Sequence, residues 1–440
     1  MLVRHPRGSL AATQNEFSIY PRNINRLMMS NMTIGAISTS PSTRMTNRAT
    51  VGRVFTLIRE GTATTRGEIG RRTGLSRTAV ASRVTALIDA RLVVEVEGSA
   101  SSVGRPPTRL TFNSGAGIVL SAAIGRSRTQ VAVCDLAGEV IVEQDVVQEV
   151  GLGPEEVMPE VVRALLALLA QSGRSTKRVK GIGISIPGTV DAERRCSRDS
   201  PIMRGWDAVP LAPYVSALAT APVYLENDTN VMALSERRGH LATYQDALIV
   251  KASTGFGAGI VAGGVMQRGA LGAAGDLGHI KTVAARGLSC RCGDSGCLEA
   301  VAGGWALVRD MRARGRDVTH IRHVVDLALD GDPGARHDIR ESGRRLGEVL
   351  ATVVNLLNPA AIIVGGDMAP AYDTFVAGLR ETLYGNASAI ATRDLQILST
   401  THADKSGVIG CAVLALDQVL SEAAVDAAWS YRSQVRRGGL

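Results

Sequence analysis

The chain is poor in aromatic residues, in lysine and in long apolar runs, and these scarcities narrow its possible functions. Only 3% of its 440 residues are aromatic, which argues against a protein that binds single-stranded nucleic acid by stacking bases on aromatic rings. No apolar run is long and uncharged enough to span a bilayer, and no signal peptide with an apolar core opens the sequence. We therefore expect a cytoplasmic protein with no membrane partner.

Because only five of the 49 basic residues are lysines, arginine carries the positive charge, and it is unevenly placed. Residues 1–110 hold 16 arginines and six acidic residues, a balance of +10, whereas the remainder holds 33 basic and 35 acidic residues, a balance of −2. A basic segment on a neutral body is typical of a nucleic-acid-binding protein. Residues 1–45 lack periodicity and predict a disordered extension. A transit peptide and a translation start at Met45 are alternatives there.

Residues 46–112 carry the pattern of a winged helix-turn-helix. Apolar residues recur at helical spacing over 51–58, Thr65 and Glu68 form a capping box, and Ser76 can cap a helix over 77–90. Two alternating segments, 92–97 and 108–112, predict strands that flank a wing. The candidates for contacting an operator in double-stranded DNA are Thr65, Arg66, Arg77, Thr78, Ala79, Ser82, Arg83, Arg105 and Arg109. The alternative is a small helical domain with arginines on its solvent-exposed face.

After a linker at 113–117, the pattern changes to alternating strands and helices. Residues 118–124, 129–134 and 140–146 predict three strands joined by tight turns, and a helix and a buried strand follow. A weaker echo of strand–turn–strand recurs over 246–268, again followed by helices. This repetition predicts a duplicated, two-lobed α/β fold with a cleft between the lobes. A last helix, at about 407–420, is expected to cross back to the first lobe.

Six cysteines are few, but three of them fall within eight residues: Cys290, Cys292 and Cys297, with His279 eleven residues upstream of the first. One imidazole and three thiolates suit tetrahedral Zn²⁺. Because four protein ligands close the coordination sphere, the sequence predicts a structural zinc and not a catalytic one. Disulfides or buried thiols are the alternative, and disulfides need an oxidising compartment.

Residues 117–420 resemble the ROK family (repressors, open reading frames and sugar kinases). The resemblance rests on Glu226-Asn-Asp228, Gly255-Phe-Gly-Ala-Gly259, the stretch from Gly269 to His279, the run from Cys290 to Glu299, and Asn358-Pro-Ala-Ala-Ile-Ile-Val-Gly-Gly366. It implies an actin-like, ribonuclease-H-type domain over 118–440, with lobe 1 at about 118–225 plus the C-terminal helix and lobe 2 at about 226–400. It also implies that the cysteine cluster holds zinc and that a sugar or phosphosugar binds residues matching the family's sugar contacts: Gly188, Asn227, Asp228, Asp276, His279 and Glu299.

The sequence departs from the kinases of that family at one turn. They carry Asp-x-Gly-Gly-Thr there, whereas the matching run here is Ala123-Ile-Gly125-Arg-Ser-Arg128. Because phosphoryl transfer depends on charge stabilisation around Mg²⁺, loss of the carboxylate predicts a protein that is not an enzyme. The resemblance then implies a sugar-responsive repressor of carbohydrate uptake or catabolism genes, acting as a homodimer or homotetramer on DNA. The alternative is an ATP-dependent sugar kinase with a DNA-binding appendage.

Overall fold

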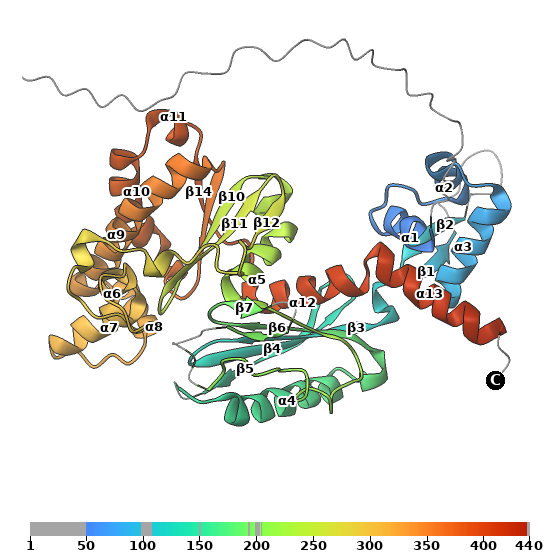
Figure 1. The fold of residues 1–440 in the computed structure, drawn as a ribbon, viewed down its shortest axis with the longest axis horizontal. Coiled ribbons are helices and arrows are strands. Elements are labelled where there is room, and N and C mark those ends of the chain that lie inside the picture. The colour runs from blue at the N-terminus through green and yellow to red at the C-terminus, as the bar shows by residue number, and fades with distance from the viewer. Residues whose placement is uncertain are drawn as a thin grey trace, which may run out of the picture. The chain divides into compact units, whose positions relative to one another are not determined.

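The computed structural model describes residues 50–97, 108–148, 151–191, 194–198, 203 and 205–437 (Figure 1). The expected disordered extension and the loop of the expected wing, with Arg105, lie outside these residues. Within them no single helix is long and apolar enough to cross a membrane. One pair bent by 51°, Ala403–Val419 with Glu422–Tyr431, passes that test of length and composition only when its two helices are taken together.

The N-terminal module consists of α1 (Val51–Arg59), α2 (Arg66–Thr73), α3 (Arg77–Asp89) and the antiparallel strands β1 (Val93–Val96) and β2 (Arg109–Phe112). Side-chain caps begin each helix, and the predicted capping box is confirmed: Thr65 Oγ1 accepts from Glu68 N while the Glu68 carboxylate accepts from Thr65 N. Phe55 packs edge to face on Phe112, with ring centroids 5.6 Å apart, which ties α1 to β2.

The first sheet has the strand order β5-β4-β3-β6-β9. Its strands are β3 (Ile118–Ile124), β4 (Arg128–Asp135), β5 (Val140–Val147), β6 (Val179–Ile186) and β9 (Val223–Asn227); β3, β4 and β5 are antiparallel, and β6 and β9 run parallel to β3. Both faces are buried, and β3 is apolar except for Ser121. Leu120 faces helix α4 (Pro154–Gln171), whereas Val119 faces helix α12 (Ser406–Val419), on opposite sides of the sheet (Figure 1).

The second sheet repeats this arrangement with the order β12-β11-β10-β13-β14. Its strands are β10 (Ala247–Ala252), β11 (Phe256–Ala262), β12 (Val265–Gln267), β13 (Ala361–Gly365) and β14 (Gln396–Ser399), again three antiparallel strands followed by two parallel ones. Helices α9 (Pro333–Leu357) and α10 (Tyr372–Asn386) cover one face, and α5 (Asp228–Ser235) packs on the other. The strand–turn–strand repeat expected from the sequence is therefore confirmed, although β14 was not predicted.

Two C-terminal helices connect distant parts of the chain. As predicted, α12 returns to the first sheet, and it also packs on α5, where Cys411 meets Val231. Helix α13 (Glu422–Arg437), which the sequence did not reveal, packs on α1. There Gly52 N donates to Asp426 Oδ1 at 2.8 Å, and a Cβ atom at Gly52 would lie 2.2 Å from the Glu422 carbonyl oxygen. Only glycine permits this approach of the two backbones.

The remaining elements are short strands, helices and 3₁₀ turns (η) that carry the loops of the cleft and the outer surface. They are η1 (Ser114–Ala116), η2 (Thr176–Arg178), β7 (Val190–Asp191), β8 (Cys196–Ser197), η3 (Glu236–Arg238), η4 (His240–Ala242), η5 (Leu277–His279), η6 (Val283–Ala285), α6 (Glu299–Ala302), α7 (Gly304–Ala313), α8 (Ile321–Leu329), η7 (Ala369–Ala371), α11 (Ala389–Thr392) and η8 (Ala403–Lys405). The expected linker at 113–117 thus contains the turn η1.

Candidate functional site

A cleft of about 510 Å³ lies where loops of both sheets meet. Strands β6, β9, β10 and β13 end at it, and the residues that follow them, Pro187, Asp228, Ser253 and Gly366, all line it. Ligands of open α/β sheets bind outside the carboxyl ends of parallel strands. Clefts of roughly 300–1,000 Å³ hold small molecules, so this one has the place and size of a small-molecule site.

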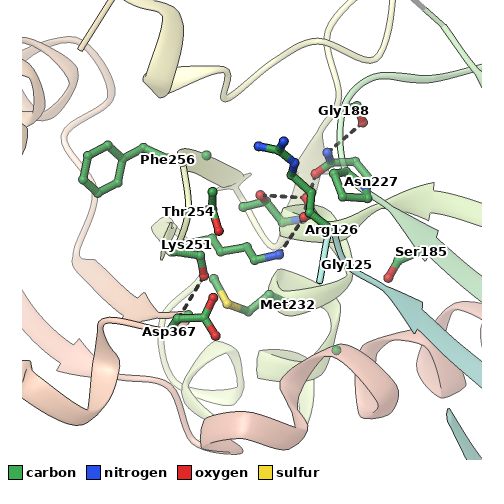
Figure 2. Close-up of a pocket in the computed structure, with 18 of the residues that line it drawn as sticks. Gly125, Arg126, Ser185, Gly188, Asn227, Met232, Lys251, Thr254, Phe256 and Asp367 are labelled. Carbon is green, nitrogen blue, oxygen red and sulfur yellow. Dashed lines mark hydrogen bonds and ion pairs between the residues drawn. The ribbon is translucent and has the colours of Figure 1, made fainter. Parts of the chain in front are cut away.

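All six residues predicted to bind sugar line this cleft, and Asn227 also makes three hydrogen bonds within the protein. Its Oδ1 caps α5, accepting from Thr229 N at 2.8 Å and Asn230 N at 3.1 Å. Its Nδ2 donates to the Gly188 carbonyl oxygen at 2.9 Å, across the turn after β6 (Figure 2). Asn227 therefore fixes the geometry between two strand ends and sets the position of Asp228 beside it.

Asp228 forms an ion pair that the sequence did not reveal. Lys251 Nζ, from β10 of the second sheet, donates to Asp228 Oδ2 at 2.6 Å, and Thr229 Oγ1 lies 3.4 Å from the other carboxylate oxygen. The two side chains are only 27% and 17% exposed. The pair therefore ties the two sheets together at the floor of the cleft.

Asp276, His279 and Glu299 occupy another wall of the cleft. Asp276 Oδ1 lies 3.9 Å from His279 Nε2, and partial burial raises the pKa of Asp276. Glu299 is buried, and its Oε1 accepts from Trp305 Nε1 at 3.3 Å. Glycine is required beside it, because a Cβ atom at Gly255 would lie 2.3 Å from Glu299 Oε2. Two carboxylates, those of Asp276 and Glu299, thus line the cleft and can accept hydrogen bonds there.

His279, Cys290, Cys292 and Cys297 form the predicted cluster, with their ligand atoms all within 4.8 Å of one another. Cys292 Sγ and Cys297 Sγ are 3.8 Å apart, and Cys290 Sγ is 3.7 Å from His279 Nδ1. A tetrahedron with Zn–S distances of about 2.3 Å has S···S edges of about 3.8 Å, so the donor set fits zinc. All six cysteines are free, which argues against the disulfide alternative.

The chain folds back at the cluster because two glycines adopt left-handed backbone conformations, with φ of 92° at Gly293 and 80° at Gly296. Lys281 Nζ donates to Cys297 Sγ at 3.2 Å and to Asp294 Oδ2 at 2.5 Å. Burial raises the pKa of the Cys290 thiol to about 12, so a cation is needed to hold it as a thiolate. Since His279 and Cys292 also line the cleft, the cluster holds one of its walls.

The turn between β3 and β4 carries the two arginines that replace the expected kinase residues. Gln148 Nε2 donates to the Gly125 carbonyl oxygen at 2.7 Å, and Gly125 N donates to the Arg128 carbonyl oxygen, so the turn is fixed. Arg128 makes two hydrogen bonds to Asp404, at 2.5 and 2.8 Å, which raise the pKa of Arg128 and lower that of Asp404. Arg128 is thus a structural tie to the start of α12.

The predicted DNA contacts fall on several parts of the N-terminal module. Arg77, Thr78 and Ser82 are exposed on α3, and Ala79 and Arg83, on the same helix, are half-buried. Arg109 is exposed at the start of β2. Thr65 is occupied as a helix cap, and Arg66 Nη1 forms an ion pair with Glu95 Oε1 at 2.5 Å. Five of the nine candidates therefore lie on α3, and three of these five are exposed.

Sequence reasoning missed Lys251, Trp305 and the ion pair between Arg322 and Asp367 at 3.1 Å, all of which line the cleft. A signal existed for two of them. Lys251 is a lysine in the otherwise apolar strand predicted over 246–252, and Asp367 closely follows the strand that ends in Gly365-Gly366. No such signal marked Trp305, because its position at the cleft depends on how the loops after β12 fold.

Fold and site together define a duplicated α/β protein with a small-molecule cleft, a cysteine–histidine cluster and an N-terminal helical module. The ROK family matches residues 119–418, and the chain belongs to that family. A xylose repressor of Caldicellulosiruptor bescii is 27% identical over 382 residues, which cover 84% of this chain and 95% of the repressor.

Two solved structures have the same fold. A ROK family transcriptional regulator, a homologue of the Escherichia coli Mlc protein, is 27% identical, with a TM-score of 0.71 over 87% of this chain and 98% of its own. A ROK family glucokinase from Streptomyces griseus, in complex with glucose and AMPPNP, is 30% identical, with a TM-score of 0.58 over 68% of this chain and 99% of its own. The match to the regulator extends beyond the ROK segment, whereas the match to the glucokinase is no longer than that segment.

Proposed function

We propose that this protein is a sugar-responsive DNA-binding transcriptional regulator, a repressor of carbohydrate uptake or catabolism genes. The observation that carries the proposal is the N-terminal module, with its arginine-bearing helix α3, in front of a ROK segment that contains a small-molecule cleft. The similarity to a xylose repressor over most of both chains supports it.

The N-terminal module is proposed to bind double-stranded operator DNA as a winged helix-turn-helix over residues 46–112. Its helices α2 and α3 are joined by a turn containing Gly74, whose φ of 69° ends α2. The exposed side chains of Arg77, Thr78 and Ser82 are then the contacts in the major groove, with Ala79 and Arg83 beside them. Arg109 is proposed to reach the DNA backbone. A homodimer or homotetramer would present two such modules to a near-palindromic site.

The ROK segment, residues 118–440, is proposed to be the sensor, joined to the DNA-binding domain by the linker at 113–117. Its two lobes, about 118–225 plus α12 and about 226–400, form an actin-like fold, and sugar in the cleft closes one lobe on the other. Asp228, Asp276, His279 and Glu299 would bind sugar hydroxyls, while Gly188 and Asn227 shape the floor. Sugar can shift the protein from its DNA-bound state to its DNA-free state only by the difference between its affinities for these two states.

A structural zinc is proposed at His279, Cys290, Cys292 and Cys297. Zinc would hold the three sulfurs as thiolates and fix the imidazole that lines the cleft. Four protein ligands leave no open coordination position, and the chemistry of the site is therefore binding and not Lewis-acid catalysis.

Two features argue against the alternative, a sugar kinase with a DNA-binding appendage. Position 123, where the kinases carry aspartate, is an alanine that packs against α12: a Cβ atom at Gly407 would lie 2.8 Å from Ala123 Cβ. Asp228, the position that matches the kinase base, is paired with Lys251. An ATP-coupled assay over a panel of sugars discriminates the two, because robust turnover would overturn the reading as a regulator alone.

DNA recognition is tested by selecting operator sequences from genomic DNA with the full-length protein and measuring affinity by fluorescence anisotropy. Replacing Arg77 and Arg83 with alanine should weaken operator binding by about 2–6 kcal/mol, if each contacts a base, and flatten its dependence on salt. The matched control is Arg163→Ala, which removes an exposed arginine from α4, where it pairs with Glu160. Unchanged affinity and salt dependence in the double variant would disprove the assignment of α3.

A further inference from the structure

Four cationic side chains line the cleft, and carboxylates neutralise three of them. Arg128 is bound by Asp404 at 2.5 and 2.8 Å, and Lys251 by Asp228 at 2.6 Å. Arg322 Nη1 lies 3.1 Å from the carboxylate of Asp367. Each of these cations therefore has its charge satisfied within the protein, and none needs a ligand to do so.

Arg126 is the exception. Throughout the described ranges its guanidinium has no hydrogen bond or ion pair, although the side chain is half-buried and lines the cleft. Figure 2 shows its guanidinium group to the left of the Asn227–Gly188 hydrogen bond, with no dashed line reaching its nitrogen atoms. Burial lowers the pKa of Arg126, and the nearby carboxylate of Glu299 only partly opposes this effect.

The protein holds Arg126 in this position. The turn that carries it is fixed by the hydrogen bonds of Gly125 to Gln148 and to the Arg128 backbone, and a Cβ atom at Gly125 would lie 2.6 Å from the Arg128 carbonyl oxygen. The neighbouring ion pair of Arg128 anchors the turn a second time. Glu299 does not serve as the partner, because its carboxylate instead accepts from Trp305 and lies against Gly255.

We propose that the ligand of this cleft is an anionic sugar, with a phosphate or carboxylate group bound by Arg126 and hydroxyls bound by Asp228, Asp276 and Glu299. The inference rests on the proposed sensor function and names the chemical class of its effector. A partly desolvated guanidinium without a carboxylate partner is a strong donor for an anion, and its planar fork matches phosphate and carboxylate oxygens. The hydroxyl-binding carboxylates would repel the same group, so the anionic group of the ligand must lie toward the β3–β4 turn.

The test is isothermal titration calorimetry of the full-length protein with matched ligands. Glucose, glucose 6-phosphate and glucuronate share one ring and differ at position 6, and the same neutral and 6-phosphate pairs are measured for mannose, galactose and N-acetylglucosamine. Inorganic phosphate is titrated alone. For the sugar that binds, we expect the phosphate or carboxylate form to bind at least about 10-fold more tightly than the neutral form, and less so in high salt.

The variant Arg126→Gln should remove this preference, a loss of about 10- to 100-fold for the anionic form alone. The matched control Arg322→Gln removes a cation that is already paired with Asp367, and should keep the preference. Equal affinity for neutral and anionic forms would overturn the inference and leave the sensor function intact. An equal loss for both forms in Arg126→Gln would assign it a structural role, again overturning the inference. Failure of every sugar to bind would instead contradict the proposed sensor function.

Discussion

The ion pair between Lys251 and Asp228 yields the sharpest prediction, because it joins the two sheets and involves a residue proposed to bind sugar. The perturbation is Lys251→Met, which keeps the length of the side chain and removes its charge. Coulomb's law gives a gross attraction of about 6 kcal/mol at 2.6 Å with an effective dielectric constant of about 20. Loss of water from both groups offsets much of that attraction.

The net effect follows from the exposure of the two side chains. Removing one partner of a fully buried pair destabilises by about 3–5 kcal/mol, whereas exposed pairs contribute about 0–1 kcal/mol. With Lys251 27% and Asp228 17% exposed, we expect Lys251→Met to lower the free energy of unfolding by about 2 kcal/mol. Asp228→Asn, introduced together with Lys251→Met, should recover about 1 kcal/mol, because it removes the carboxylate that was left unpaired.

The measurement is urea unfolding followed by tryptophan fluorescence, which reports on Trp206, Trp305 and the more exposed Trp429. A double-mutant cycle over the wild type, the two single variants and the double variant isolates the interaction. Arg163→Ala, which breaks an exposed ion pair with Glu160, is the control and should change stability by less than about 1 kcal/mol. If Lys251→Met changes the free energy of unfolding as little as the control does, and the cycle shows no coupling, the pair does not hold the sheets together.

Three further outcomes are expected. Cys297→Ser should lower the zinc content from one ion per chain and reduce the thermal stability of the ROK segment, while operator affinity persists; normal zinc by mass spectrometry would contradict the ligand assignment. Ala123→Asp should not create kinase activity in an ATP-coupled assay, because the turn still carries two arginines. The depressed pKa of Asp404 stabilises the fold at pH values above its unfolded pKa of about 3.9, and this contribution is lost as the pH falls through the lower folded value. Arg128→Gln should therefore make the free energy of unfolding depend less on pH in acid. If the urea midpoint of this variant changes between pH 2 and 6 as much as that of the wild type, the pairing of Arg128 with Asp404 does not stabilise the fold.

Local signals in the sequence predicted much of the fold. The return of the last predicted helix to the first sheet was confirmed. The capping box at Thr65 and the strand–turn–strand repeat were also confirmed, because both depend on residues close together in the chain. The cysteine–histidine cluster could be predicted because its three cysteines lie within eight residues, so that their sulfur atoms are close in space.

Features that depend on distant residues could not be predicted. Lys251 and Asp228 meet only because β10 and β9 end at the same cleft, and nothing local marks either as the other's partner. The hydrogen bonds by which the Asn227 amide caps α5 and holds the Gly188 carbonyl oxygen are likewise not marked by any local pattern. Helix α13 escaped notice because its residues are largely polar or small, and its partner, α1, lies at the opposite end of the described sequence.

The contact between α13 and α1 has a mechanical consequence. Arg128 ties the turn that carries Arg126 to the start of α12, and α12 continues through Leu420 into α13, which meets α1 at Gly52. The turn, the two helices and the N-terminal module are thus linked in series, in parallel with the short covalent connection at 113–117. A side chain at position 52 would therefore disrupt the contact between α13 and α1 while leaving the covalent connection intact.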